Sequence, residues 1–185
     1  YDDWHNVIRA TSATGVVYEF TYDVWGNNTS VSITYGDTKI TSSATYSADG
    51  NRLESTTDAL GKTTTYGYNA DTNVLEWVEY PEDTAETRTE YSYDALYRLA
   101  TAETMVDSGY SLAVEYGYTD DLLTSIMTNS TTYNFTYGLF AQSAAIKVGT
   151  RTLASYSYTE DQNRYLSALD YGNGDKVQYT YDTYG

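Results

Sequence analysis

The chain has 185 residues, of which 23 are tyrosine, one is proline and none is cysteine, and its formal net charge is −16. The lack of cysteine excludes disulfide bonds and thiolate chemistry. A surface this acidic repels phosphate backbones and anionic membranes, so we expect no nucleic-acid partner and, with no long apolar run, no membrane insertion. The abundance of tyrosine and threonine favours β-strands, because aromatic and β-branched side chains suit a pleated, half-buried surface.

A short phrase recurs along the whole chain: an aromatic residue, any residue, tyrosine, and then aspartate or another turn former. Successive copies lie 19 to 25 residues apart. The second aromatic of the phrase falls at Tyr22, Tyr46, Tyr68, Tyr93, Tyr118, Tyr137, Tyr158 and Tyr181, with Tyr1 as a ninth copy. This period predicts a single array of about eight to nine repeats over residues 1–185.

Each repeat begins with a segment in which aromatic residues alternate with small or polar ones. A period of two places such residues on one face of a strand. The alternating pairs that we assign to the repeat motif are Tyr66 and Tyr68, Tyr91 and Tyr93, Tyr116 and Tyr118, Tyr156 and Tyr158, and Tyr179 and Tyr181. We therefore expect a strand that enters each repeat with its rings on one face.

Turn-forming residues follow the tyrosines, and an aliphatic residue then starts a second strand. Asp and Asn bond their own backbone, and glycine accepts a positive φ. The positions that carry this pattern are Asp23, Gly26, Gly50, Asp94 and Asp182 for the turns, and Leu53 and Leu99 for the returning strands. Each repeat is thus predicted to be a β-hairpin, which is marginal alone and is stabilised by stacking on its neighbours.

Several of these phrases resemble the YD repeat, also called the Rhs repeat. The resemblance rests on Phe20-Thr-Tyr22-Asp23-Val-Trp-Gly26-Asn27, on Tyr91-Ser-Tyr93-Asp94-Ala-Leu-Tyr97-Arg98-Leu99, and on Tyr179-Thr-Tyr181-Asp182. The family comprises bacterial Rhs and wall-associated proteins, shell components of insecticidal toxin complexes, and animal teneurins. The resemblance implies an all-β fold in which stacked hairpins form a curved or spiralling antiparallel sheet, an open segment of an Rhs/YD shell.

The chain departs from the family pattern at several turns. Tyr97 stands where a glycine usually follows Asp94, Thr119-Asp-Asp121 follows Tyr118, and Gly138-Leu-Phe140 follows Tyr137. The Asp-Pro motif of the family's self-cleaving module is missing, so we expect no self-cleavage. Because both chain ends stand inside the phrase, we interpret the sequence as a piece of a larger protein.

The inventory of reactive side chains is poor. His5 is the single histidine, so a Ser-His-Asp triad would have to use it, and a zinc site fails for the same reason. Glu54, Asp58, Glu76 and Glu79 could supply a glycosidase-type carboxylate pair, but they occupy unequal places in the repeat. Turn chemistry explains motifs such as Asp49-Gly-Asn51 without calcium. We therefore predict no catalytic residue, no metal and no cofactor.

Two functional hypotheses remain. In the first, the chain is a non-enzymatic wall segment of a bacterial secreted or cell-surface protein, whose shell encloses or displays other domains for toxin delivery or cell contact. Its partners are then the flanking repeats of the same polypeptide. In the second, exposed rings, Trp25 and Trp77 first, stack on glycans of a cell wall or partner cell. Unpaired edge strands could also let the fragment associate with itself.

Overall fold

The computed structural model describes residues 1–81, 87–107 and 109–185, and the described residues are all-β. They form sixteen strands in one sheet whose spatial order follows the chain order from β1 to β16. Every strand pairing with a described register is antiparallel, as in β2 with β3 and β14 with β15. The prediction of stacked antiparallel hairpins is thereby confirmed. None of the described helical segments is long and apolar enough to cross a membrane.

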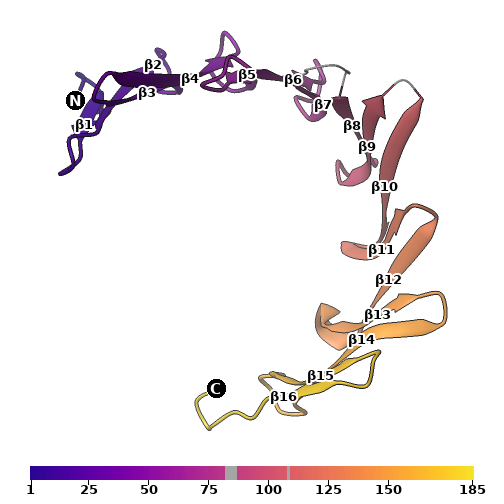
Figure 1. Ribbon diagram of the computed structural model, residues 1–185. Helices are drawn as coiled ribbons and strands as arrows, with labels where there is room; N and C mark the ends of the chain where they lie inside the picture. Colours follow the sequence, from indigo (N-terminus) through magenta and orange to yellow (C-terminus); the bar gives the residue numbers. More distant parts are fainter. Residues whose placement is uncertain (82–86, 108) are drawn as a thin grey trace. The chain divides into compact units, whose positions relative to one another are not determined.

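Contacts divide the chain into two compact units, which we describe separately. The first comprises Tyr1–Tyr91 with Thr104–Ser111. Its strands are β1 (Arg9–Thr11), β2 (Val17–Tyr22), β3 (Asn28–Tyr35), β4 (Thr38–Tyr46), β5 (Leu53–Thr57), β6 (Thr63–Tyr68), β7 (Leu75–Tyr80) and β8 (Thr87–Tyr93, whose last two residues belong to the second unit). Consecutive strands lie side by side through this unit (Figure 1).

The second unit comprises Ser92–Glu103 with Leu112–Gly185. Two of its strands, β9 (Leu99–Asp107) and β10 (Tyr110–Thr119), also contribute residues to the first unit. The others are β11 (Leu122–Thr128), β12 (Thr131–Tyr137), β13 (Ser143–Val148), β14 (Arg151–Tyr158), β15 (Leu166–Tyr171) and β16 (Lys176–Gln178). A short 3₁₀ turn, η1 (Leu139–Ala141), separates β12 from β13.

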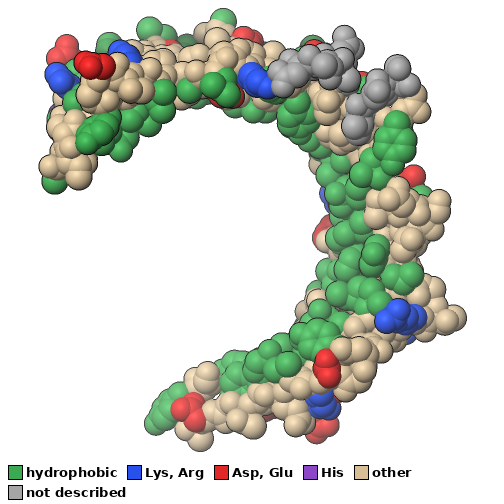
Figure 2. All heavy atoms as spheres, viewed as in Figure 1, with side chains coloured by type: hydrophobic (Ala, Val, Ile, Leu, Met, Phe, Trp, Pro, Cys, Tyr) green, Lys and Arg blue, Asp and Glu red, His purple; other side chains and the backbone are tan. Residues whose placement is uncertain are grey.

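The sheet is thin, and its side chains are half-buried rather than enclosed. Among the described residues only Val78, Ala154 and Ala168 form a buried hydrophobic core. Hydrophobic side chains gather instead along one face of the strands in each unit (Figure 2). This follows from the repeat. Alternation along each strand places the aromatic rings on one face of the sheet, and only the adjacent hairpins bury them.

Candidate functional site

In five phrases the first aromatic lies directly opposite an aliphatic residue on the returning strand. Tyr66 pairs with Val78 and Tyr116 with Ile126. The same register joins Tyr156 to Leu169, Phe20 to Val31 and Phe135 to Ile146. Directly opposed aromatic and aliphatic side chains are the unit of sheet stabilisation, each pair contributing about 0.2–1 kcal/mol. Of the other residues assigned to this position, Tyr91 lies near the end of β8 within the first unit, and Tyr179 follows β16.

A β-bulge occurs at the second aromatic of the phrase. Thr21 pairs with Ser30 but Tyr22 pairs with Asn28, so one residue of the returning strand is passed over. The register shifts in the same way at Tyr46, Tyr68, Tyr118, Tyr137 and Tyr158. A bulge increases the local twist and turns the side chain away from its regular direction. Here it occurs where the tyrosine pairs with the returning strand that follows it, as Tyr22 of β2 does with Asn28 of β3.

The hydroxyl groups of six tyrosines at this position of the phrase form a ladder that joins a repeat to the one before it. Each of the six donates a hydrogen bond to a backbone carbonyl on, or just before, the preceding strand. The donor and acceptor pairs are Tyr22 to Val7 (3.0 Å), Tyr46 to Asn28 (3.2 Å), Tyr68 to Leu53 (2.9 Å), Tyr118 to Leu99 (3.0 Å), Tyr137 to Leu123 (2.6 Å) and Tyr181 to Leu166 (2.7 Å). We call this set of bonds the tyrosine ladder.

The acceptor in the tyrosine ladder follows a simple rule. It is the residue that pairs with the second aromatic of the preceding repeat: Leu53 pairs with Tyr46 and accepts from Tyr68. Likewise Leu166 pairs with Tyr158 and accepts from Tyr181. Leu53 and Leu166, which start their returning strands, therefore have a second role as hydrogen-bond acceptors. A phenylalanine could fill the same space but could not make this bond.

Aspartate after the tyrosine organises the turn. The Oδ1 atom of Asp23 accepts hydrogen bonds from the backbone N–H groups of Trp25 and Asn27, both at 2.9 Å. Asp94 does the same for Leu96 and Arg98, at 2.8 and 3.0 Å, and its Oδ2 accepts from Arg98 Nε at 2.7 Å. Hydrogen bonds from the Arg98 backbone hold the pKa of Asp94 below its ordinary value, because they favour the ionised form.

The fourth residue of the five-residue turn adopts a left-handed conformation. Gly26 has φ 87° and donates its N–H to the Asp23 carbonyl at 3.2 Å. Tyr97 takes the equivalent place after Asp94 with φ 60°, and its N–H bonds the Asp94 carbonyl at 3.0 Å. The sequence departure at Tyr97 thus keeps the turn, but a non-glycine residue bears the backbone strain.

The remaining turn residues of the motif lie in related loops. Gly50 has φ 73° in the turn between β4 and β5, and Asp182 accepts a hydrogen bond from the Tyr184 N–H at 2.8 Å. Tyr93 is the last residue of β8, directly before Asp94. Leu53 and Leu99 each begin a strand and accept a bond of the tyrosine ladder.

Both tryptophans proposed as glycan platforms pack on other parts of the sheet. Trp25 donates its indole N–H to the Ala48 carbonyl at 3.2 Å and packs on Gly50, where an added Cβ would collide with it; its side chain is 61 % exposed. Trp77 is half-buried against Gly67, where an added Cβ would likewise collide, and the Arg88 guanidinium lies 4.4 Å from its ring centre. Each ring therefore has a packing role within the first unit.

The reactive candidates occupy separate places in the turns and in the strand register. His5 is exposed at the fourth position of the Asp2 turn, with φ 67°. Asp58 caps the turn between β5 and β6. Glu76 lies on β7, and its carboxylate accepts a hydrogen bond at 2.7 Å from Asn69, which follows the opposite end of β6. Glu54 and Glu76 are the residues passed over at bulges, and Glu79 pairs with Thr65 in the strand register. Within the described ranges, no cluster of three or more His, Cys, Asp or Glu residues could hold a metal.

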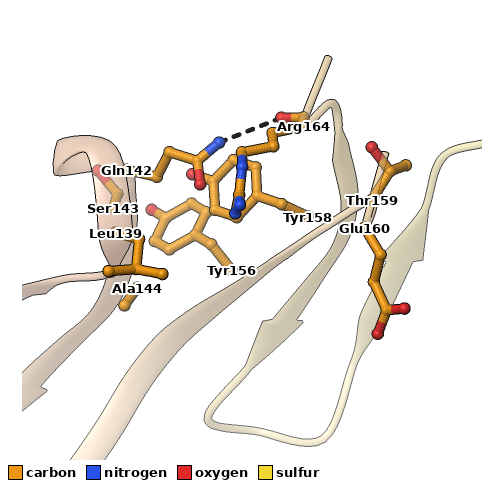
Figure 3. Close-up of a pocket in the computed structure, with 10 residues that line it drawn as sticks. Leu139, Gln142, Ser143, Ala144, Tyr156, Tyr158, Thr159, Glu160 and Arg164 are labelled. Atoms are coloured by element: carbon orange, nitrogen blue, oxygen red, sulfur yellow. Dashed lines mark hydrogen bonds between the residues drawn. The ribbon is translucent and has the colours of Figure 1, made fainter. Parts of the chain in front are cut away.

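A cleft of about 360 Å³ opens in the second unit where the repeat is least regular (Figure 3). Its walls come from the unusual turn after Tyr137 and from the long turn after Tyr158. Leu139 and Gln142 lie on the first turn, Arg164 lies on the second, and the rings of Tyr156 and Tyr158 line the cleft between them. Sequence reasoning noted the irregular Gly138-Leu-Phe140 turn but not this cleft, because the two turns are more than twenty residues apart.

Comparison with known proteins gives one family and one fold. The family model described as RHS Repeat matches residues 1–40 and 46–85. No curated protein matches the sequence. Among solved structures, the crystal structure of TcdB2-TccC3-TEV aligns with a TM-score of 0.52 at 18% identity, over 98% of this chain and 13% of that one. This likeness shows the fold, and the chain spans only about an eighth of that neighbour.

Two further solved structures align with lower scores. A porin-like protein from Bacteroides uniformis gives a TM-score of 0.48 at 13% identity, over 92% of both chains. The Tc holotoxin pore of Photorhabdus luminescens gives 0.48 at 18% identity, over 99% of this chain and 12% of that one.

Proposed function

We propose that this chain, which matches the RHS Repeat model over residues 1–40 and 46–85, supplies wall to a β-shell of a larger secreted or surface protein. As a structural repeat segment, its partners are the flanking repeats of the same polypeptide. The shell encloses or displays other domains for toxin delivery or cell contact. In this proposal the chain carries out no catalysis of its own.

The observation that carries the proposal is the tyrosine ladder. Each bond joins consecutive hairpins at the same place, as Tyr118 to Leu99 and Tyr137 to Leu123 do in the second unit. Backbone pairing alone can extend a sheet to any length. The tyrosine ladder adds a side-chain hydrogen bond between consecutive repeats, along the edge of the sheet where the turns lie. Such a strip suits a wall, since six repeats are held in the same way by the one before.

The proposal is tested on the full-length gene product that carries this sequence. Cryo-electron microscopy should show these repeats as part of a continuous wall around an interior space. Limited proteolysis should spare segments inside that space, and combined Tyr68→Phe and Tyr137→Phe substitutions should expose them sooner, because two bonds of the wall are lost. Repeats that hang free of any shell, or equal protease sensitivity of all segments, would contradict the proposal.

The glycan-binding alternative is less well supported, because Trp25 packs on the neighbouring repeat and Trp77 packs on Gly67 of its own hairpin. Co-sedimentation with insoluble cell-wall polysaccharide separates the two ideas. A wall segment should remain in the supernatant, as should the Trp25→Ala/Trp77→Ala variant. Saturable binding that the double substitution abolishes, without a loss of melting temperature, would favour glycan recognition instead.

A further inference from the structure

Tyr158 breaks the rule of the tyrosine ladder. The residue that pairs with the preceding Tyr137 is Ser143, so the Ser143 carbonyl is the acceptor expected for the Tyr158 hydroxyl. Within the described part of the chain, that hydroxyl makes no hydrogen bond with any residue. The reason lies in the turn after Tyr137, where η1 and the left-handed residues Phe140 and Ala141 replace the usual Asp turn and alter the approach to Ser143.

Arg164 is exceptional in the same place. Arg98, the last residue of its turn, uses its guanidinium fully: it pairs with Asp94 at 2.7 Å, donates to the Asp120 carbonyl and lies 4.3 Å from the Tyr118 ring centre. Arg164 lies one residue before the end of its turn, in the left-handed conformation that Tyr97 has in the Asp94 turn. The guanidinium of Arg164 lies 4.5 Å from the Phe140 ring centre, yet it donates no hydrogen bond to the described residues.

The carboxylates in the same turn do not bond the Arg164 guanidinium. Asp161 Oδ1 accepts from the Thr159 hydroxyl at 2.9 Å and from the backbone N–H groups of Asn163 and Arg164, both at 3.0 Å, so it serves the turn. The Glu160 side chain extends away from the Arg164 guanidinium and the two tyrosine rings (Figure 3). Gln142 donates its amide N–H to the Arg164 carbonyl at 3.2 Å, which fixes the backbone of Arg164 beside the cleft.

We propose that this cleft binds a small carboxylate that carries an aromatic ring. A guanidinium and a phenol with no acceptor of their own face the same space, and a carboxylate can accept from both. The rings of Tyr156 and Tyr158, with Leu139 and Ala144, supply apolar surface for the ring of the ligand. A volume of about 360 Å³ suits a small molecule. This site is independent of the wall function.

The test uses the 185-residue chain and 3-phenylpropionate as the probe, with its neutral amide and inorganic phosphate for comparison. We expect saturable NMR shifts at the backbone amides of Tyr158 and Arg164 with the acid. The amide should bind about tenfold more weakly or not at all, because it lacks the charge that the guanidinium recognises. Phosphate should bind more weakly as well, since it has no ring.

Matched variants locate the site. Arg164→Gln should weaken binding of the acid about tenfold and Tyr158→Phe severalfold, while Arg52→Gln and Tyr46→Phe, an arginine and a ladder tyrosine of the first unit, should leave it unchanged. All variants are first compared by circular dichroism, and Tyr158→Phe should fold normally since its hydroxyl has no described partner. Equal binding of acid and amide, unchanged binding in Arg164→Gln, or no saturable shift at tens of millimolar would overturn the proposal. Phosphate binding as tight as that of the acid would overturn the requirement for a ring.

Discussion

The Tyr137 hydroxyl lies 2.6 Å from the Leu123 carbonyl and joins β12 to the start of β11. Tyr158, one repeat later, has the same place in the sequence phrase but no such bond in the described structure. Replacing each by phenylalanine removes one oxygen atom in two otherwise similar settings. The pair therefore measures what one bond of the tyrosine ladder contributes.

We expect Tyr137→Phe to lower the free energy of unfolding by about 1 kcal/mol, because it leaves the Leu123 carbonyl without its donor. Tyr158→Phe should change it by no more than a few tenths of a kcal/mol. Urea unfolding followed by circular dichroism provides the comparison. Equal effects of the two substitutions would show that the ladder bonds add no stability.

We expect the substitution Tyr97→Gly to raise the free energy of unfolding. Its φ of 60° costs about 1–2 kcal/mol for an L-residue, while glycine loses about 0.5–1 kcal/mol of chain entropy. Because the Tyr97 side chain is 61 % exposed, little packing is lost. Tyr97→Gly should thus stabilise the chain by about 0.5–1 kcal/mol. The reverse experiment, Gly26→Ala at φ 87° with open space around the new methyl, should destabilise it; a rise in melting temperature there would refute the strain argument.

Gly67 provides the space in which Trp77 lies. A Cβ on residue 67 would overlap the indole ring, so we expect Gly67→Ala to destabilise the first unit by about 2 kcal/mol through overpacking. A double-mutant cycle with Trp77→Leu isolates the contact, since the smaller side chain should make Gly67→Ala much less costly. Strict additivity of the two changes in thermal unfolding would mean that the ring and the glycine do not interact.

The Asp turns predict loss of stability in acid. The pKa values of Asp2, Asp23, Asp49, Asp94 and Asp161 are all lowered by hydrogen bonds within their turns. For Asp23 these bonds outweigh desolvation, the largest single influence, which acts in the opposite direction. A lowered pKa in the folded state contributes stability that is present above the ordinary value of 3.8 and is lost as the pH falls through the lower, folded value.

Unfolding midpoints between about pH 6 and pH 2 test this linkage. Asp94→Asn should be less stable than the parent chain near neutral pH, and the difference should shrink in acid, where the parent carboxylate is also neutral. Asp37→Asn is the matched control, because the Asp37 carboxylate has no hydrogen bond in the described structure. A difference between Asp94→Asn and the parent that stays constant across this acid range would argue against the turn carboxylate as the cause.

The amino-acid sequence by itself determined the repeat and its hairpins. Alternation at Tyr66 and Tyr68 predicts one ring-bearing strand face, and Asp23 with Gly26 predicts a turn, because both signals depend only on residues close together in the chain. The all-β fold therefore followed from local patterns. The positions of the rings within each phrase follow from the same alternation.

Only the tertiary structure decided which atoms meet between repeats. A hydroxyl on Tyr68 reaches Leu53, and Arg164 meets Phe140, across 15 and 24 residues of chain. Bulges and irregular turns decide these contacts, because they shift the register between paired strands. The direction in which a side chain then points depends on the strand with which its own strand pairs. For the same reason, two tyrosines in equivalent phrases, Tyr137 and Tyr158, differ in what they bond. The turn of the previous repeat, and not the phrase itself, places the backbone carbonyl that would accept the bond.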